Sequence, residues 1–108
     1  MHTHTLLRAT LAATAILALA TLARAADAPA NWSAKCAACH APDGKGKPAL
    51  KTKDYTSPDV QAKLTDDELT KAITDGITTS KPPMPAFKGK LTPDEIKALA
   101  AHIRSLKK

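Results

Sequence analysis

The sequence predicts a small all-α protein. Helix-start signals recur along the chain, apolar residues follow them at helical spacing, and no segment alternates polar and apolar residues long enough to suggest a strand. The 108 residues include one Trp, one Tyr and one Phe. A short chain with so few large side chains buries little apolar surface, so we expect a bound group to complete the core.

The first predicted helix runs from about Pro29 to Cys39. Pro29 suits the first turn of a helix because the amide hydrogen that proline lacks needs no partner there. Two cysteines, Cys36 and Cys39, lie near the end of this helix. A shorter helical turn is predicted after Ser57-Pro58, covering residues 59–63.

The second main helix begins with the capping box of residues 65–68, Thr-Asp-Asp-Glu. Leu64 and Leu69 flank the box and are expected to pack together as a hydrophobic staple. The helix is predicted to end near Asp75, with Gly76 in the left-handed conformation that terminates many helices.

The third main helix begins with a second capping box, residues 92–95, in which Pro93 stands at the first helical position. Leu91 and Ile96 form the matching staple. An apolar stripe at helical spacing follows, which predicts an amphipathic helix with one buried face. The stripe consists of Ile96, Leu99, Ala100, Ile103 and Leu106.

Residues 1–25 have the pattern of a cleavable signal peptide. A polar to basic start precedes an apolar run from Leu11 to Leu22, and Ala23-Arg24-Ala25 offers small residues for cleavage. We therefore expect one exported, periplasmic domain, residues 26–108. The apolar run is too short to span a bilayer comfortably, and an uncleaved membrane anchor facing the periplasm is the alternative.

Cys36-Ala37-Ala38-Cys39-His40 has the C-x-x-C-H spacing of a covalent attachment site for c-type haem. The chain has two cysteines in all, so a four-ligand zinc site lacks the further thiols it would need. A thioredoxin-like dithiol would require an α/β context that the pattern does not predict. We expect one covalent haem c per chain, held through Cys36 and Cys39, with His40 as an iron ligand.

Met84 is the candidate for the second iron ligand. It lies between prolines in Lys81-Pro82-Pro83-Met84-Pro85 and is the one methionine outside the N-terminal segment. Without the cysteine motif it would be interpreted as a flexible core residue. The intervening chain from His40 is long enough to carry the second helix and return across the opposite face of a porphyrin.

Three ordered motifs resemble those of the class I cytochromes c, in particular the short bacterial type. Residues 36–40 resemble the attachment motif, residues 43–50 the proximal loop and residues 83–87 the distal loop. The resemblance implies a domain of three main helices plus a short helix wrapped around the haem. It also implies that the Pro48 carbonyl accepts a hydrogen bond from His40, and that Leu50 packs on the proximal haem face.

The same resemblance places Trp32 against the C-terminal helix, at Leu99 and His102. Two positions depart from the family pattern. Ala41 stands where the family often has Gly, and His102 stands where it usually has an aromatic residue. His102 is therefore either a second candidate axial ligand or an imidazole that packs beside Trp32.

Imidazole and thioether ligation leaves no open iron position, which favours an electron carrier rather than an enzyme. The alternatives are a haem sensor or enzyme with a dissociable Met84, and an electron-transfer subunit of a dehydrogenase or oxidase complex. The chain has a net charge of +6, and lysines in the loops expected around the haem predict redox partners with acidic surfaces. Nucleic acid is not expected, because no recognition motif is present. These lysines are Lys45, Lys47, Lys51, Lys53, Lys81, Lys88 and Lys90.

Overall fold

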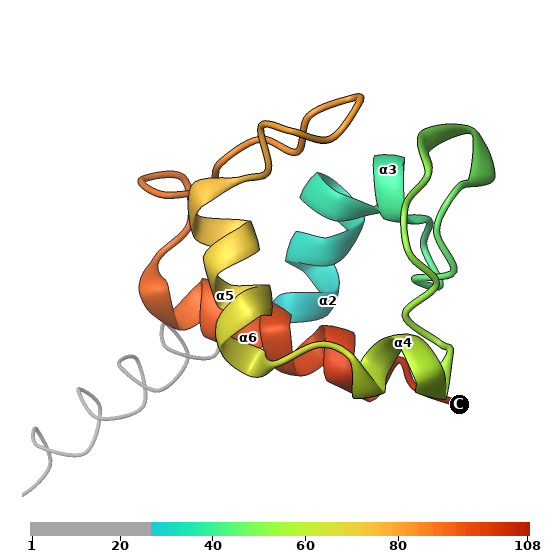
Figure 1. Cartoon of the computed structure of the whole chain (residues 1–108). Coiled ribbons are helices and arrows are strands. Elements are labelled where there is room, and N and C mark those ends of the chain that lie inside the picture. Colours follow the sequence, from blue (N-terminus) through green and yellow to red (C-terminus); the bar gives the residue numbers. More distant parts are fainter. Residues whose placement is uncertain (1–26) are drawn as a thin grey trace, which may run out of the picture.

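The computed structural model describes residues 27–108, which form helices joined by long loops (Figure 1). Within this part of the chain, β structure is limited to two isolated bridges, Ile77 with Met84 and Lys88 with Leu91. The all-α prediction is therefore confirmed. In chain order the elements are α2 (Ala28–Asn31), η1 (Trp32–Cys36), α3 (Ala37–His40), η2 (Pro48–Leu50), α4 (Pro58–Ala62), α5 (Asp66–Asp75) and α6 (Pro93–Ser105).

The first three elements follow one another without a break and form the first predicted helix. Asp27 begins it, because its side chain accepts a hydrogen bond from the Ala30 amide at 3.2 Å. Residues 32–36 form a π-helical turn, which the residue pattern does not predict. This wider turn ends at Cys36, the first residue of the cysteine motif, and π turns of this kind are frequent at functional sites.

Both predicted capping boxes are present. The hydroxyls of Thr65 and Thr92 each accept from the amide three residues on at 3.1 Å, and the carboxylates of Glu68 and Glu95 accept in return. The prediction for Gly76 is correct only in part. Its φ of 72° is positive, but its ψ of −178° is extended rather than left-handed helical, so the chain leaves α5 at a different angle.

Helix α6 supplies a large part of the core. In Figure 1 it crosses beneath α5 and α2, and the residues of its apolar stripe pack in one cluster with Ala28 of α2 and with Leu69 and Ile73 of α5. Leu99 has no exposed surface and Leu106 is half-buried. The remaining buried core comprises Ala28, Trp32, Leu69, Ile73, Phe87, Leu91, Ile96, Ala100 and Ile103. The staple residues of both capping boxes belong to or pack against this cluster.

A polar network joins α4 to α6. The buried amide of Gln61 donates to the carbonyls of Tyr55 and Ile103, both at 2.8 Å. Arg104 donates in turn to the main-chain and side-chain oxygens of Gln61 and to the Leu64 carbonyl. The network adds hydrogen bonds to carbonyls near the C-terminal ends of α4 and α6 and in the loops on either side of α4.

The predicted signal peptide, residues 1–25, lies outside the described residues. Within residues 27–108 no helix combines the length and the apolar character needed to cross a membrane.

Candidate functional site

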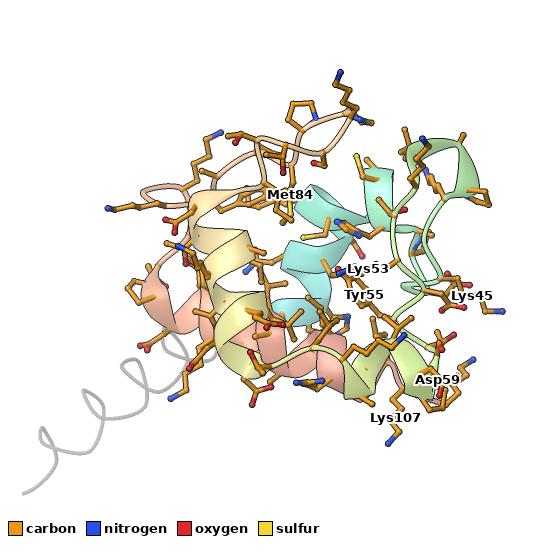
Figure 2. All side chains as sticks on the ribbon, in the orientation of Figure 1. Lys45, Lys53, Tyr55, Asp59, Met84 and Lys107 are labelled. Carbon is orange, nitrogen blue, oxygen red and sulfur yellow. The ribbon has the colours of Figure 1, made fainter. Side chains whose placement is uncertain are left out.

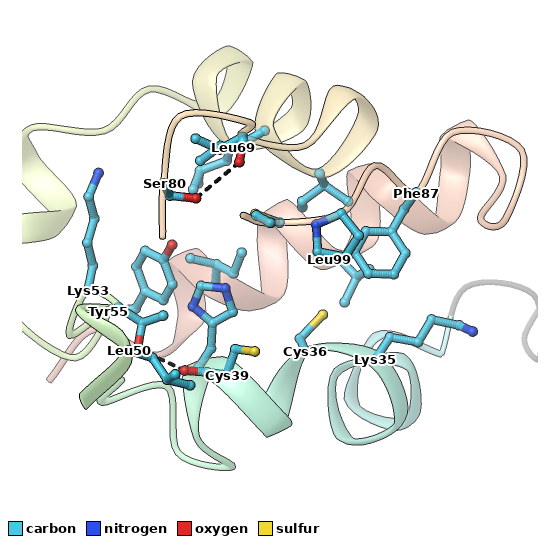
Figure 3. A pocket seen from close by; sticks show the side chains of 18 of the residues that line it. Lys35, Cys36, Cys39, Leu50, Lys53, Tyr55, Leu69, Ser80, Phe87 and Leu99 are labelled. Atoms are coloured by element: carbon cyan, nitrogen blue, oxygen red, sulfur yellow. Dashed lines mark hydrogen bonds between the residues drawn. The ribbon is translucent and has the colours of Figure 1, made fainter. Parts of the chain in front are cut away.

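A cavity of about 430 Å³ opens between the end of the first helical segment, helix α5 and the loop that follows α5 (Figure 3). Its walls are mainly apolar. The aliphatic and aromatic lining residues include Leu50, Tyr55, Leu64, Leu69, Ala72, Ile73, Phe87, Leu99 and Ile103. The structure therefore leaves a large space in the middle of a small protein, as expected if a bound group completes the core.

The two cysteines lie along one side of this cavity. Cys36 ends the π turn and Cys39 lies three residues later, so both thiols are on the helix face that lines the cavity (Figure 3). Both are free thiols. Burial raises the pKa of the Cys36 thiol, and Lys35 partly opposes that shift. The pair can form covalent bonds to two neighbouring groups of one flat ligand.

His40 also lines the cavity, between two aromatic rings. Its ring centroid lies 5.8 Å from that of Trp32 and 5.7 Å from that of Tyr55. Burial lowers the pKa of His40, which favours the neutral imidazole, the form that can donate a lone pair to a metal. Its Nδ1 is buried without a hydrogen-bond partner among the described residues. This nitrogen therefore lacks the hydrogen bond that would fix the orientation of the ring.

The hydrogen bond expected between His40 and the Pro48 carbonyl is not formed. That carbonyl instead accepts from the Lys51 amide at 3.1 Å, which closes the short helix η2. Pro48 is exposed, whereas Leu50, at the end of η2, lines the cavity as expected. Leu50 thus lies where the resemblance implies, whereas the Pro48 carbonyl is bonded to Lys51 and not to His40.

Thr52 holds the end of α3, a role that no sequence motif indicates. Its hydroxyl donates to the Cys39 carbonyl at 2.8 Å and accepts from the Lys47 amide at 2.7 Å. The Gly46 amide donates to the His40 carbonyl at 3.0 Å. The loop after the cysteine motif is therefore hydrogen-bonded to the backbone of Cys39 and His40, the last two residues of the motif.

Met84 reaches the cavity from the loop that follows α5 (Figure 2). Its amide donates to the Ile77 carbonyl and its carbonyl accepts from the Ile77 amide, both at 3.0 Å. Met84 is half-buried. The structure thus brings the thioether of Met84 to the cavity that His40 and both cysteines also line, although these residues are distant in the sequence.

His102 packs beside Trp32 and does not line the cavity. Their ring centroids are 5.5 Å apart, and the described residues around the cavity do not include His102. The indole of Trp32 also donates to the carbonyls of Ala41 and Pro42, at 3.1 and 3.2 Å. The packing interpretation of His102 therefore fits the structure, and the ligand interpretation does not.

Of the lysines expected around the site, Lys51 and Lys53 line the cavity, and Lys35 joins them. Lys35 lies on the helix directly before Cys36, and not in one of the loops that the sequence predicts around the haem. Lys45 lies apart from the cavity on the far side of its loop (Figure 2). The basic groups at the cavity are thus fewer than the sequence suggests and come from two segments.

The residues at the cavity fit a haem. They combine two thiols at attachment spacing, a neutral imidazole with an unpaired nitrogen, a thioether and apolar walls. A neutral imidazole and a thioether are also the ligands used in cytochromes that only transfer electrons.

The part of the chain that forms the cavity is similar in sequence and in structure to known proteins. A family model described as "Cytochrome C oxidase, cbb3-type, subunit III" matches residues 23–103. A cytochrome c6 of Leptolyngbya boryana is 37% identical over 81 residues, covering 72% of this chain and 91% of the relative. A cytochrome c6 of Limnospira maxima is 35% identical over 72 residues, covering 67% and 81%. The solved KustC0563 c-type cytochrome has a TM-score of 0.67 at 30% identity, covering 76% of this chain and 99% of that chain.

Proposed function

Because the chain belongs to the class I cytochrome c family, we propose that it is a periplasmic carrier of single electrons with His40 and Met84 as its iron ligands. Its cofactor is haem c, covalently bound, which supplies the one-electron iron chemistry when present. Cys36 and Cys39 are the attachment residues in this proposal.

The observation that carries the proposal is the meeting of His40 and Met84 at one cavity that both cysteines also line. His40 comes from the end of α3 and Met84 from the loop after α5. Imidazole and thioether together leave no free coordination position for a substrate. This supports a carrier rather than an enzyme.

The anchoring of Met84 supports a carrier over a small-ligand sensor. A sensor needs a ligand that leaves the metal readily, whereas two backbone hydrogen bonds to Ile77 restrain Met84. A ligand that stays in place in both redox states also keeps structural rearrangement small when one electron arrives.

Met84 ligation can be tested by visible spectroscopy of the purified holoprotein. The ferric protein should show the weak long-wavelength band of sulfur-ligated haem, and Met84→Ala should abolish it, lower the potential and admit added imidazole. His102→Ala is the matched control and should keep the band. Loss of the band in the His102 variant, with its retention in Met84→Ala, would overturn the assignment. Acid–acetone extraction should leave the haem on the protein.

The redox partners are proposed to have acidic docking surfaces, because the exposed lysines Lys35, Lys51 and Lys53 border the cavity. The association rate with such a partner should fall as salt rises, since screening limits the reach of charges to roughly 10 Å at about 0.1 M salt. Replacing Lys51 and Lys53 by Glu should weaken this salt dependence, whereas the same change at Lys107 should have little effect. A rate that is independent of salt would contradict the acidic partner.

A further inference from the structure

We propose that Gly76 is a positioning residue, which seats the backbone of the Met84 segment (residues 84–88) directly on the end of helix α5. The inference rests on the proposed function only in taking Met84 to be an iron ligand. The contact itself involves residues that are apart in the chain and is visible in the described structure.

The end of α5 is a docking site for the Met84 segment. A helix leaves its last carbonyls without partners inside the helix. Here the Phe87 amide donates to the Ile73 carbonyl at 2.9 Å, and the Lys88 amide donates to the Thr74 carbonyl at 3.1 Å. The paired bonds between Met84 and Ile77 extend this contact. The helix end and the Met84 segment thus satisfy each other's backbone groups.

Gly76 lies directly against the backbone of the Met84 segment. A Cβ atom built there would be 2.5 Å from the Met84 carbonyl oxygen, 2.8 Å from the Ala86 nitrogen and 2.9 Å from the Pro85 carbonyl carbon. All three are backbone atoms, so no side-chain rotation can relieve the overlap. The φ of 72° with an extended ψ is also a conformation that essentially only glycine adopts.

A side chain at position 76 would therefore displace the residue that carries the thioether. The displaced Met84 would leave its place at the cavity more often, although the thioether itself is unchanged. Gly76 acts in this way through Met84 and needs no contact with the haem.

The test compares Gly76→Ala with Gly89→Ala in the ferric holoprotein. Gly89 has a positive φ of 80°, but a Cβ there would meet nothing within 4 Å. Gly89→Ala therefore introduces a side chain at positive φ without displacing Met84. We expect Gly76→Ala to weaken the long-wavelength sulfur band and to speed the binding of added imidazole by about tenfold. Gly89→Ala should change neither, and equal behaviour of the two variants would overturn the proposal.

Amide hydrogen exchange of the holoprotein provides a second measurement that does not depend on iron ligation. The Met84 and Ile77 amides should be protected in the wild type, and Gly76→Ala should speed their exchange by about tenfold while Gly89→Ala leaves it unchanged. If Gly76→Ala does not fold, the wild-type protein alone decides. Slow exchange of its Met84 and Ile77 amides then supports the inference, because it shows that the Met84 segment is bonded to the end of α5, and fast exchange overturns it. A wild-type protein with protected amides but without the sulfur band would refute Met84 ligation and leave the docking of the segment standing.

Discussion

Replacing Ala41 by glycine should stabilise the holoprotein, although it removes a side chain. Ala41 follows His40 with a φ of 68° and a ψ of 154°, a region that residues with a Cβ atom occupy only under strain. Its carbonyl accepts from the Trp32 indole at 3.1 Å and from the Gly44 amide at 3.2 Å. These bonds hold the residue in the strained conformation.

The magnitude follows from two opposing terms. Relief of the strained conformation is worth on the order of 2 kcal/mol. Glycine has more conformational freedom in the unfolded chain, which offsets about 0.7 kcal/mol of that gain. The net expectation is roughly 1 kcal/mol of added stability, which corresponds to a rise in Tm of about 4–8 °C for a domain of this size.

Thermal and guanidinium unfolding of the ferric holoprotein, followed by circular dichroism, measures the change. Ala101→Gly is the matched control, because Ala101 is exposed in the regular helix α6. That variant should lose about 1 kcal/mol, the usual difference between alanine and glycine in a helix. A loss of stability in Ala41→Gly similar to that of the control would refute the strain at Ala41.

Four further variants test contributions to stability. Arg104→Met should lower the free energy of unfolding by about 2–3 kcal/mol, because the guanidinium loses its hydrogen bonds to the part-buried carbonyls of Gln61 and Leu64. The Arg104 Nε also donates to Asp66 Oδ1 at 2.7 Å, but the Asp66 side chain is 79% exposed, so Asp66→Asn should lower the free energy of unfolding by only about 0.5 kcal/mol. Equal losses in the Arg104 and Asp66 variants would contradict this ranking. Hydrogen bonds, first that from the Thr92 amide, lower the pKa of Glu95 below its ordinary value of 4.5. Its stabilisation is complete above that value and is lost as the pH falls through the lower folded pKa, so acid titration of Glu95→Gln should show a shallower decline. Trp32→Phe removes the donor to two carbonyls and should lower Tm, at a cost of about 1 kcal/mol or more; an unchanged Tm would mean that water replaces the indole.

The sequence alone predicts the helices because their determinants are local. A capping box such as residues 65–68 involves a side chain and an amide only three residues apart, so a few neighbouring residues decide whether it forms. The C-x-x-C-H motif is also local, and together with Met84 between its prolines it predicts the two thiols, the imidazole and the thioether that line the cavity. The helical core of α6 followed from apolar spacing in the same way.

Contacts between distant segments were decided by the tertiary structure. Gln61 and Arg104 belong to no recognisable sequence motif. They form a network only because the fold brings the C-terminal ends of α4 and α6 together. The Pro48 carbonyl accepts from the Lys51 amide and receives no hydrogen bond from His40, which depends on how the loop lies against the imidazole and not on the local sequence. Gly76 looks like an ordinary helix terminator in the sequence. Its second role, as the surface on which the Met84 segment rests, exists only once the chain has folded back on α5.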